Sequence, residues 1–82
     1  MENLSIEAKV LILVKETLEK EDCDIGWSEN LFDYGLNSMK SIALIVKLEE
    51  EFDVVFEDEE LLFENFTNIH LITDRLKEHL NL

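Results

Sequence analysis

Asp33-Tyr34-Gly35-Leu36-Asn37-Ser38-Met39, at positions 33–39, carries more information about this chain than any other segment. A glycine-bearing turn leads directly into a proline-free amphipathic run, so we expect a helix to begin at Ser38. The Ser38 hydroxyl then lies at a helix N-terminus, where unpaired backbone N–H groups and the helix dipole favour negative charge. Gly35 supplies the unusual backbone angles that aim the serine outward. A phosphodiester formed on the Ser38 hydroxyl would therefore lie where its negative charge is stabilised.

The length and composition indicate one small globular domain, which we expect to span residues 1–82. A chain of 82 residues is too short for a second core, and 46% hydrophobic residues exclude a disordered tail. The longest apolar run, residues 10–14, is far shorter than the ~18 residues of a membrane span. The N-terminus, with Glu2 before any lysine, does not resemble a secretory signal. We therefore expect a cytoplasmic protein and, at this size, a monomer.

The net charge of −13 narrows the class of partner. Twenty acidic against seven basic residues repel nucleic acid and favour basic protein surfaces. Eight acids and no base lie between positions 49 and 60: Glu49, Glu50, Glu51, Asp53, Glu57, Asp58, Glu59 and Glu60. Either a partner recognises this cluster or it is a solvated helix face followed by a loop, and both interpretations stay open.

Neither a metal site nor a hydrolase site is expected. Cys23 is the only cysteine, which excludes an internal disulfide and agrees with a reducing compartment. His70 and His79 are nine residues apart, off the spacing of metal ligands on one helix. Ser38 is flanked by Asn37 and Met39 and so lacks the Gly-x-Ser-x-Gly elbow of a serine hydrolase. We expect a protein that is not an enzyme.

Apolar residues recur at steps of three and four in three segments of the chain, and this spacing predicts three long helices. We place the first at about 4–20, capped by Ser5 or Asn3, the second from Ser38 to about Phe52, and the last after a capping Thr67. The second is apolar over so much of its circumference that we expect it to touch several other helices and to lie, on at least one side, at the centre of the bundle. The residues that follow its helical period, and that we expect inward, are Met39, Ile42, Ile45, Leu48 or Glu49, and Phe52, with Leu44 and Val46 widening the apolar stripe.

The connections are expected to contain one further short helix. Residues 23–37 read as a long loop with apolar anchors, in which Ser28 caps a single turn. Residues 54–56 read as an extended link that ends in the core at Phe56. A short helix is expected at 58–63 and a turn at 65–67. The fold class predicted from the sequence is therefore all-α, a small four-helix bundle of three longer helices and one short helix.

Nearly the whole chain resembles the acyl and peptidyl carrier proteins. Those domains are four-helix bundles with an Asp-x-Gly-x-(Asp/Asn)-Ser-(Leu/Met) motif, whose serine bears a 4′-phosphopantetheine. The motif is present here as Asp33, Gly35, Asn37, Ser38 and Met39. Residues 48–52 and the acids at 58–60 are similar to the end of the family's second helix and to its third-helix region.

The resemblance implies transport of cargo by a protein that does no catalysis. A phosphopantetheinyl transferase would attach the arm, derived from coenzyme A, to Ser38, while Asp33, Gly35 and Asn37 shape the approach. The terminal thiol would hold cargo as a thioester for a loading enzyme and for downstream synthase or tailoring enzymes. The candidates for contact with these partners are Leu36, Met39, Glu49, Glu50 and Asp53. Met39 has a competing interpretation as a plain core residue.

Two departures from the fatty-acid carriers bear on the pathway. Many of those carriers have aspartate before the serine and proline after the second helix, whereas this chain has Asn37 and no proline. Asn37 removes a charge beside Ser38, which favours a specialised polyketide or nonribosomal-peptide pathway, or a carrier loaded with an amino acid. The alternative from a different class of function is an unmodified acidic helical module that binds a basic protein. The mass of the protein after expression with a phosphopantetheinyl transferase distinguishes these hypotheses, because a carrier gains the arm and an interaction module does not.

Overall fold

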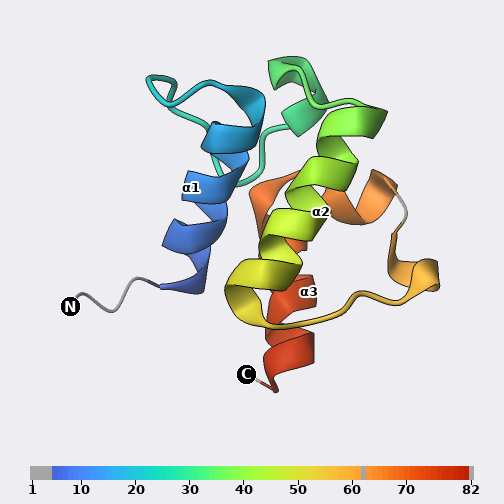
Figure 1. Cartoon of the computed structure of the whole chain (residues 1–82). Helices are drawn as coiled ribbons and strands as arrows, with labels where there is room; N and C mark the ends of the chain where they lie inside the picture. Colours follow the sequence, from blue (N-terminus) through green and yellow to red (C-terminus); the bar gives the residue numbers. More distant parts are fainter. Residues whose placement is uncertain (1–4, 62, 82) are drawn as a thin grey trace.

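Three α-helices form the frame of the protein, shown in Figure 1 for a computed structural model that describes residues 5–61 and 63–81. They are α1 (Ile6–Leu18), α2 (Ser38–Phe52) and α3 (Ile69–Leu80). Three short 3-10 turns lie in the connections: η1 (Leu31–Tyr34), η2 (Asp58–Glu60) and η3 (Phe63–Phe66). The described residues contain no strand, and the predicted all-α class is confirmed. No helix in those residues has the length and apolarity that crossing a bilayer requires.

The core lies where the three helices meet. α1 packs against both α2 and α3, and η3 packs against α3, so the main helix contact of α2 is with α1 and not, as expected, with several helices. Phe56, the expected core plug, is buried and meets the ring of Phe66 edge to face at 5.6 Å. The buried apolar side chains are Val10, Val14, Leu18, Ile25, Leu31, Leu36, Leu44, Leu48, Phe56, Phe66, Ile69, Ile72 and Leu76.

The expected short helix at 58–63 is two separate 3-10 turns, η2 and η3. Phe56 and Phe66 are both buried and in contact, so the segment between them is pinned to the core at two points. The amide of Asn65 donates to the Glu60 carbonyl at 2.9 Å and joins the two turns. Residues 65 and 66, expected in a turn, belong to η3.

One of the helix caps expected from the sequence is correct. Ser5 caps α1, because its Oγ accepts a hydrogen bond from the Ala8 N–H at 3.0 Å. The alternative cap, Asn3, lies outside the described residues. The helix ends at Leu18, two residues earlier than expected, where Glu19 adopts a left-handed conformation with φ 57° and ψ 44°.

The other two expected caps are displaced by one or two residues. Asn68, and not Thr67, caps α3, since its Oδ1 accepts from the Leu71 N–H at 2.8 Å. Asn30, and not Ser28, caps η1, and its Oδ1 accepts from the Phe32 N–H at 2.9 Å. Both asparagines directly precede the first helical residue with an extended backbone, which is the geometry that a cap requires.

Candidate functional site

Ser38 is exposed and is the first residue of α2. Asn37 caps the helix: its Oδ1 accepts from the Lys40 N–H at 2.8 Å and its carbonyl accepts from the Ser41 N–H at 2.7 Å. Because Asn37 does the capping, the Ser38 hydroxyl is not used to hold the helix end, and it makes no hydrogen bond within the described residues. The fold therefore presents this hydroxyl to solvent.

Gly35 turns the chain toward Ser38. It adopts φ 102° and ψ 6°, in the left-handed region, and a Cβ added there would meet no atom within 4 Å. The backbone angle, and not lack of space, is thus the reason for glycine at this position. Asp33 is exposed in η1, and its N–H donates to the Asn30 carbonyl at 3.0 Å.

Leu36 is part of the core and not of the surface. It was a candidate for partner contact, yet its side chain is 4% exposed, so the structure contradicts that expectation. Its N–H donates to the Leu31 carbonyl at 3.2 Å, and both leucines are buried. The side chain anchors the turn two residues before Ser38, because burying an apolar group there stabilises one conformation of the turn.

The loop that leads to the site is tied to the start of α3. The Leu31 N–H donates to the Thr67 carbonyl at 2.7 Å and the His70 N–H donates to the Trp27 carbonyl at 3.1 Å. Within the loop, the Tyr34 hydroxyl donates to Glu29. That bond lowers the pKa of Glu29, with help from the Gly26 N–H, and raises the pKa of Tyr34. The loop that precedes Ser38 is therefore held in place by hydrogen bonds to α3 and within the loop itself.

One face of α2 that we expected in the core lies in solvent. Met39, Ile42 and Val46 are 81%, 63% and 45% exposed, so the inward orientation expected for them is wrong, and so is the core alternative for Met39. The buried residues of α2 are Ser41, Leu44 and Leu48. Residues 39, 42 and 46 share a second helical stripe about 180° away from that buried stripe. The spacing could have revealed two stripes, but not which one faces the core.

The charges along α2 are distributed against its dipole. Its first turn contains no carboxylate and its last turn no base, while Glu49, Glu50, Glu51 and Asp53 gather at its C-terminal end. Carboxylates are disfavoured at a helix C-terminus and phosphate is favoured at an N-terminus. The helix dipole alone therefore does not account for the four acids at this end.

The four acids at this end differ in availability. Glu50 and Asp53 are exposed, and Asp53 ends the helix in a left-handed conformation with φ 55°. Glu49 is half-buried, and its Oε2 accepts from the Phe56 N–H at 3.0 Å. Glu51 pairs with Lys9 of α1 at 3.9 Å. Within residues 5–61 and 63–81, the side chains of Glu50 and Asp53 have no ion-pair or hydrogen-bond partner, whereas Glu49 and Glu51 also serve the fold.

In the part of the chain that the structure describes, the exposed Ser38 hydroxyl has no hydrogen-bonding neighbour that could activate it. No histidine or acid makes a hydrogen bond to Ser38 within the described residues. His79 is instead bound to Glu60, with Nε2 at 2.9 Å from Oε1. The part of the chain that the structure describes contains no group of three or more His, Cys, Asp or Glu side chains able to hold a metal ion.

Comparison with known proteins shows the family to which this helical bundle belongs. The family model "Phosphopantetheine attachment site" matches residues 8–76. Aminoacyl carrier protein 2 of Bradyrhizobium diazoefficiens is 31% identical over 68 residues, covering 80% of this chain and 76% of the relative. Aminoacyl carrier protein 1 of the same organism is 31% identical over 72 residues, covering 85% and 80%.

A solved structure is similar in three dimensions as well. It is a chain from the complex of Bradyrhizobium japonicum glycine:[carrier protein] ligase with glycylated carrier protein. The TM-score is 0.70 at 30% sequence identity, over 88% of this chain and 99% of that chain. The protein belongs to the carrier-protein family with a phosphopantetheine attachment site.

Family membership defines the class of activity. The protein is a non-catalytic carrier, and its cofactor is a covalently attached 4′-phosphopantetheine. The region around Ser38 fits such a group, because an exposed hydroxyl lies at a helix N-terminus whose first turn contains no acid.

Proposed function

We propose that Ser38 bears the phosphopantetheine arm and that the protein is a free-standing carrier, one domain over residues 1–82, acting as a monomer in the cytoplasm. The observation that carries this proposal is the exposed Ser38 hydroxyl at the start of α2, capped by its neighbour Asn37. In the reaction of a phosphopantetheinyl transferase, Ser38 Oγ would bond to the phosphorus of coenzyme A that carries the pantetheine, the pyrophosphate bond would break, adenosine 3′,5′-bisphosphate would leave, and the hydroxyl proton would pass to a base of the enzyme. The phosphate would then lie at the favourable end of the α2 dipole.

The cargo that we propose is an aminoacyl group, held as a thioester on the arm. The support is the naming of the curated relatives as aminoacyl carrier proteins and the glycylated state of the carrier in the similar complex. Asn37, in place of the aspartate of many fatty-acid carriers, adds to it. A specialised pathway is accordingly favoured over fatty-acid synthesis, with an aminoacyl-loading ligase and downstream synthase or tailoring enzymes as partners.

The partner surface that we propose is the exposed side of α2. Met39, Ile42 and Val46 offer an apolar stripe on a chain of net charge −13. Exposed Glu50 and Asp53 continue it toward the C-terminal end. A basic enzyme surface with an apolar centre complements this arrangement, because opposite charge speeds the encounter and apolar contact adds affinity. Glu49 contributes charge there, while its hydrogen bond to Phe56 holds it to the fold.

The decisive experiment is the intact mass of the protein after incubation with coenzyme A and a broad-specificity phosphopantetheinyl transferase. We expect wild type to gain one phosphopantetheine and Ser38→Ala to gain none while folding normally. Ser41→Ala is the matched control, because Ser41 is 3% exposed and its buried hydroxyl cannot reach an enzyme. An unmodified wild type would favour the alternative, an acidic interaction module that is never modified.

A further inference from the structure

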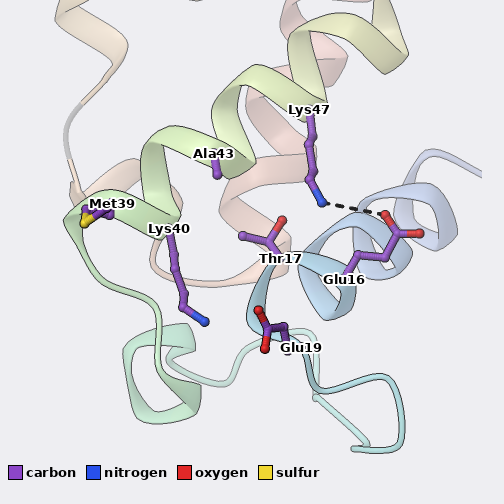
Figure 2. Close-up of a pocket in the computed structure, with 7 residues that line it drawn as sticks. All are labelled: Glu16, Thr17, Glu19, Met39, Lys40, Ala43 and Lys47. Atoms are coloured by element: carbon purple, nitrogen blue, oxygen red, sulfur yellow. Dashed lines mark ion pairs between the residues drawn. The ribbon is translucent and has the colours of Figure 1, made fainter.

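The turn that leads to Ser38 receives little support from the α-helices. Its first part, η1, packs against no other described element as extensively as α1 packs against α2 and α3. Figure 2 shows an open groove of about 330 Å³ between the end of α1 and the first half of α2. No residue of positions 20–37 lines this groove, and its lining residues are Glu16, Thr17, Glu19, Met39, Lys40, Ala43 and Lys47. The turn therefore depends on contacts of its own.

Gly35 is the flexible point of the turn. Its left-handed backbone angle and the absence of any atom within 4 Å of an added Cβ leave it unrestrained by neighbouring side chains. The backbone bonds that span it are at the long end of the usual range: Gly35 N lies 3.3 Å from Phe32 O, and Leu36 N lies 3.2 Å from Leu31 O. Buried Leu36 anchors one side of the glycine. A second anchor, on the η1 side, is needed to define how the two sides are oriented.

Tyr34 supplies this second anchor through its hydroxyl, which donates to the Glu29 carboxylate. The same Oε1 of Glu29 accepts from the Gly26 N–H at 2.9 Å, and the Glu29 N–H donates to the Gly26 carbonyl at 3.2 Å. A Cβ added at Gly26 would lie 3.2 Å from Glu29 Cγ, so the side chain folds closely over the glycine. One carboxylate thus closes residues 26–34 into a ring, here named the Glu29–Tyr34 clasp.

The clasp connects the turn to α3. Trp27 lies within the closed ring, and its carbonyl accepts from the His70 N–H of α3 at 3.1 Å. The hydrogen bond of the clasp lowers the pKa of Glu29 and raises the pKa of Tyr34, so the ionised carboxylate and the neutral hydroxyl are both the stable forms at neutral pH. The end of η1 is thereby held from α3 although η1 does not pack along that helix.

Asp33 is the residue that the clasp places relative to Ser38. It directly precedes Tyr34, is exposed, and its side chain makes no hydrogen bond or ion pair within the described residues. An enzyme that reaches the Ser38 hydroxyl also meets this carboxylate, because only residues 34–37 separate the two. Both groups can be bound at once only when the backbone at Gly35 keeps one conformation.

We propose that Tyr34 and Glu29 are positioning residues for arm attachment, because their hydrogen bond fixes η1 and thereby the placement of Asp33 relative to Ser38. The inference rests on the proposed function, in which Ser38 accepts the arm. Neither side chain takes part in the transfer, and each acts by keeping the turn in the conformation that the transferase binds. Opening the clasp lowers the population of that conformation, which raises KM and leaves kcat unchanged.

The test measures transfer of phosphopantetheine from coenzyme A to Tyr34→Phe, to Glu29→Ala and to the double variant. We expect each single variant to raise KM about fivefold, the effect of losing one hydrogen bond, with kcat within about twofold of wild type. The double variant should be no slower than Glu29→Ala, since both substitutions open the same clasp. Glu21→Ala is the matched control and should stay within about twofold, because it removes an exposed acid from the same connection without breaking a side-chain hydrogen bond of the described residues.

Two further measurements separate positioning from charge and from global stability. Glu29→Gln keeps an amide oxygen that can accept from both donors, so its KM should stay within about twofold of wild type. In Tyr34→Phe the Gly35 N–H should exchange faster with solvent, whereas the Leu71 N–H at the start of α3 should exchange as in wild type.

Three results would overturn the proposal in different ways. Tyr34→Phe with the KM of wild type would exclude the clasp from arm attachment and leave the carrier function standing. Glu29→Gln or Glu21→Ala as slow as Glu29→Ala would show that charge, and not the hydrogen bond, is responsible. A wild-type protein that gains no arm at all would overturn the proposed function itself.

Discussion

His79, on the last turn of α3, contacts both carboxylate oxygens of Glu60 in η2. Its Nε2 lies 2.9 Å from Oε1 and 3.0 Å from Oε2. Arg75 approaches the same carboxylate at 3.8 Å and donates to Asn65 at 3.2 Å. The imidazole also meets the ring of Phe56 edge to face at 5.1 Å. This polar cluster holds the connection between α2 and α3 onto the end of α3.

Glu60 should make stability depend on pH. Partial burial raises its pKa, but the Glu57 N–H and the side chains of His79 and Arg75 outweigh burial and hold that pKa below its usual value. A lowered folded-state pKa means that the stabilisation is complete above the unfolded pKa, ~4.3, and is lost as pH falls through the folded value. We expect Glu60→Gln to lower the free energy of unfolding at pH 7 by about 1–2 kcal/mol.

Urea unfolding at pH 7 and at pH values below 4 measures this effect. The difference between wild type and Glu60→Gln should shrink as pH falls through the folded-state pKa of Glu60, because the wild-type carboxylate then takes up a proton and loses its charge. Exposed Glu59 is the neighbouring control, and Glu59→Gln should change little at either pH. A constant difference across the whole range would mean that ionisation of Glu60 does not contribute.

The cap at Asn37 should stabilise α2 independently of any role in arm attachment. Asn37→Ala removes the acceptor for the Lys40 N–H and should cost about 1 kcal/mol in the free energy of unfolding. Asn37→Asp keeps the acceptor and adds a charge that the dipole favours, so the unmodified protein should be at least as stable as wild type. Once the phosphopantetheine arm is attached to Ser38, the stability of Asn37→Asp relative to wild type should fall, because the new carboxylate at position 37 and the phosphate of the arm repel each other.

Thermal melts of the unmodified and modified forms measure this change. Asn68→Ala is the matched control, since Asn68 caps α3 with the same 2.8 Å geometry, away from Ser38. It should cost similar stability in both forms. If the arm shifts the melting temperatures of Asn37→Asp and wild type equally, the phosphate does not sit near residue 37.

Salt should raise the melting temperature. The acids at the end of α2 oppose its dipole and repel one another, and screening at 0.1 M salt reduces interactions beyond ~10 Å. Divalent cations should act at lower concentrations than sodium does. Glu50→Lys relieves the repulsion directly, so it should melt higher at low salt and respond less to added salt. A melting temperature of wild type that is insensitive to both ions would show that these charges do not strain the fold.

The acidic end of α2 should also govern encounter with enzymes. Glu50→Lys should slow arm attachment by about tenfold or less, through association, because exposed charge pairs are individually worth ~1 kcal/mol or under. Glu50 is preferable to Glu49 for this test, since Glu49 also binds the Phe56 N–H. Asp74→Lys, at an exposed position of α3, is the control with the same change of charge. Equal rates for the two variants across a salt series would exclude the acidic end from recognition.

Features that depend on residues close together in the sequence could be predicted from the sequence alone. Helix α2 has the expected bounds, Ser38–Phe52, because a turn with glycine precedes it and an apolar period fills it. Gly35 adopts the left-handed angle expected of it, and Phe56 is the expected core plug. These features depend on residues a few positions apart, so their signal is complete within one segment.

Packing between distant segments determined the rest. Leu36 is buried while Met39 and Ile42 are exposed, although all are apolar and lie close to Ser38. A helix that is apolar on most sides can turn either stripe inward, and only contact with α1 settles which one is covered. The groove at Lys40 likewise exists only because the end of α1 lies alongside α2. Sequence spacing therefore determined which residues form α2, whereas the neighbouring helix decided which of them meet solvent.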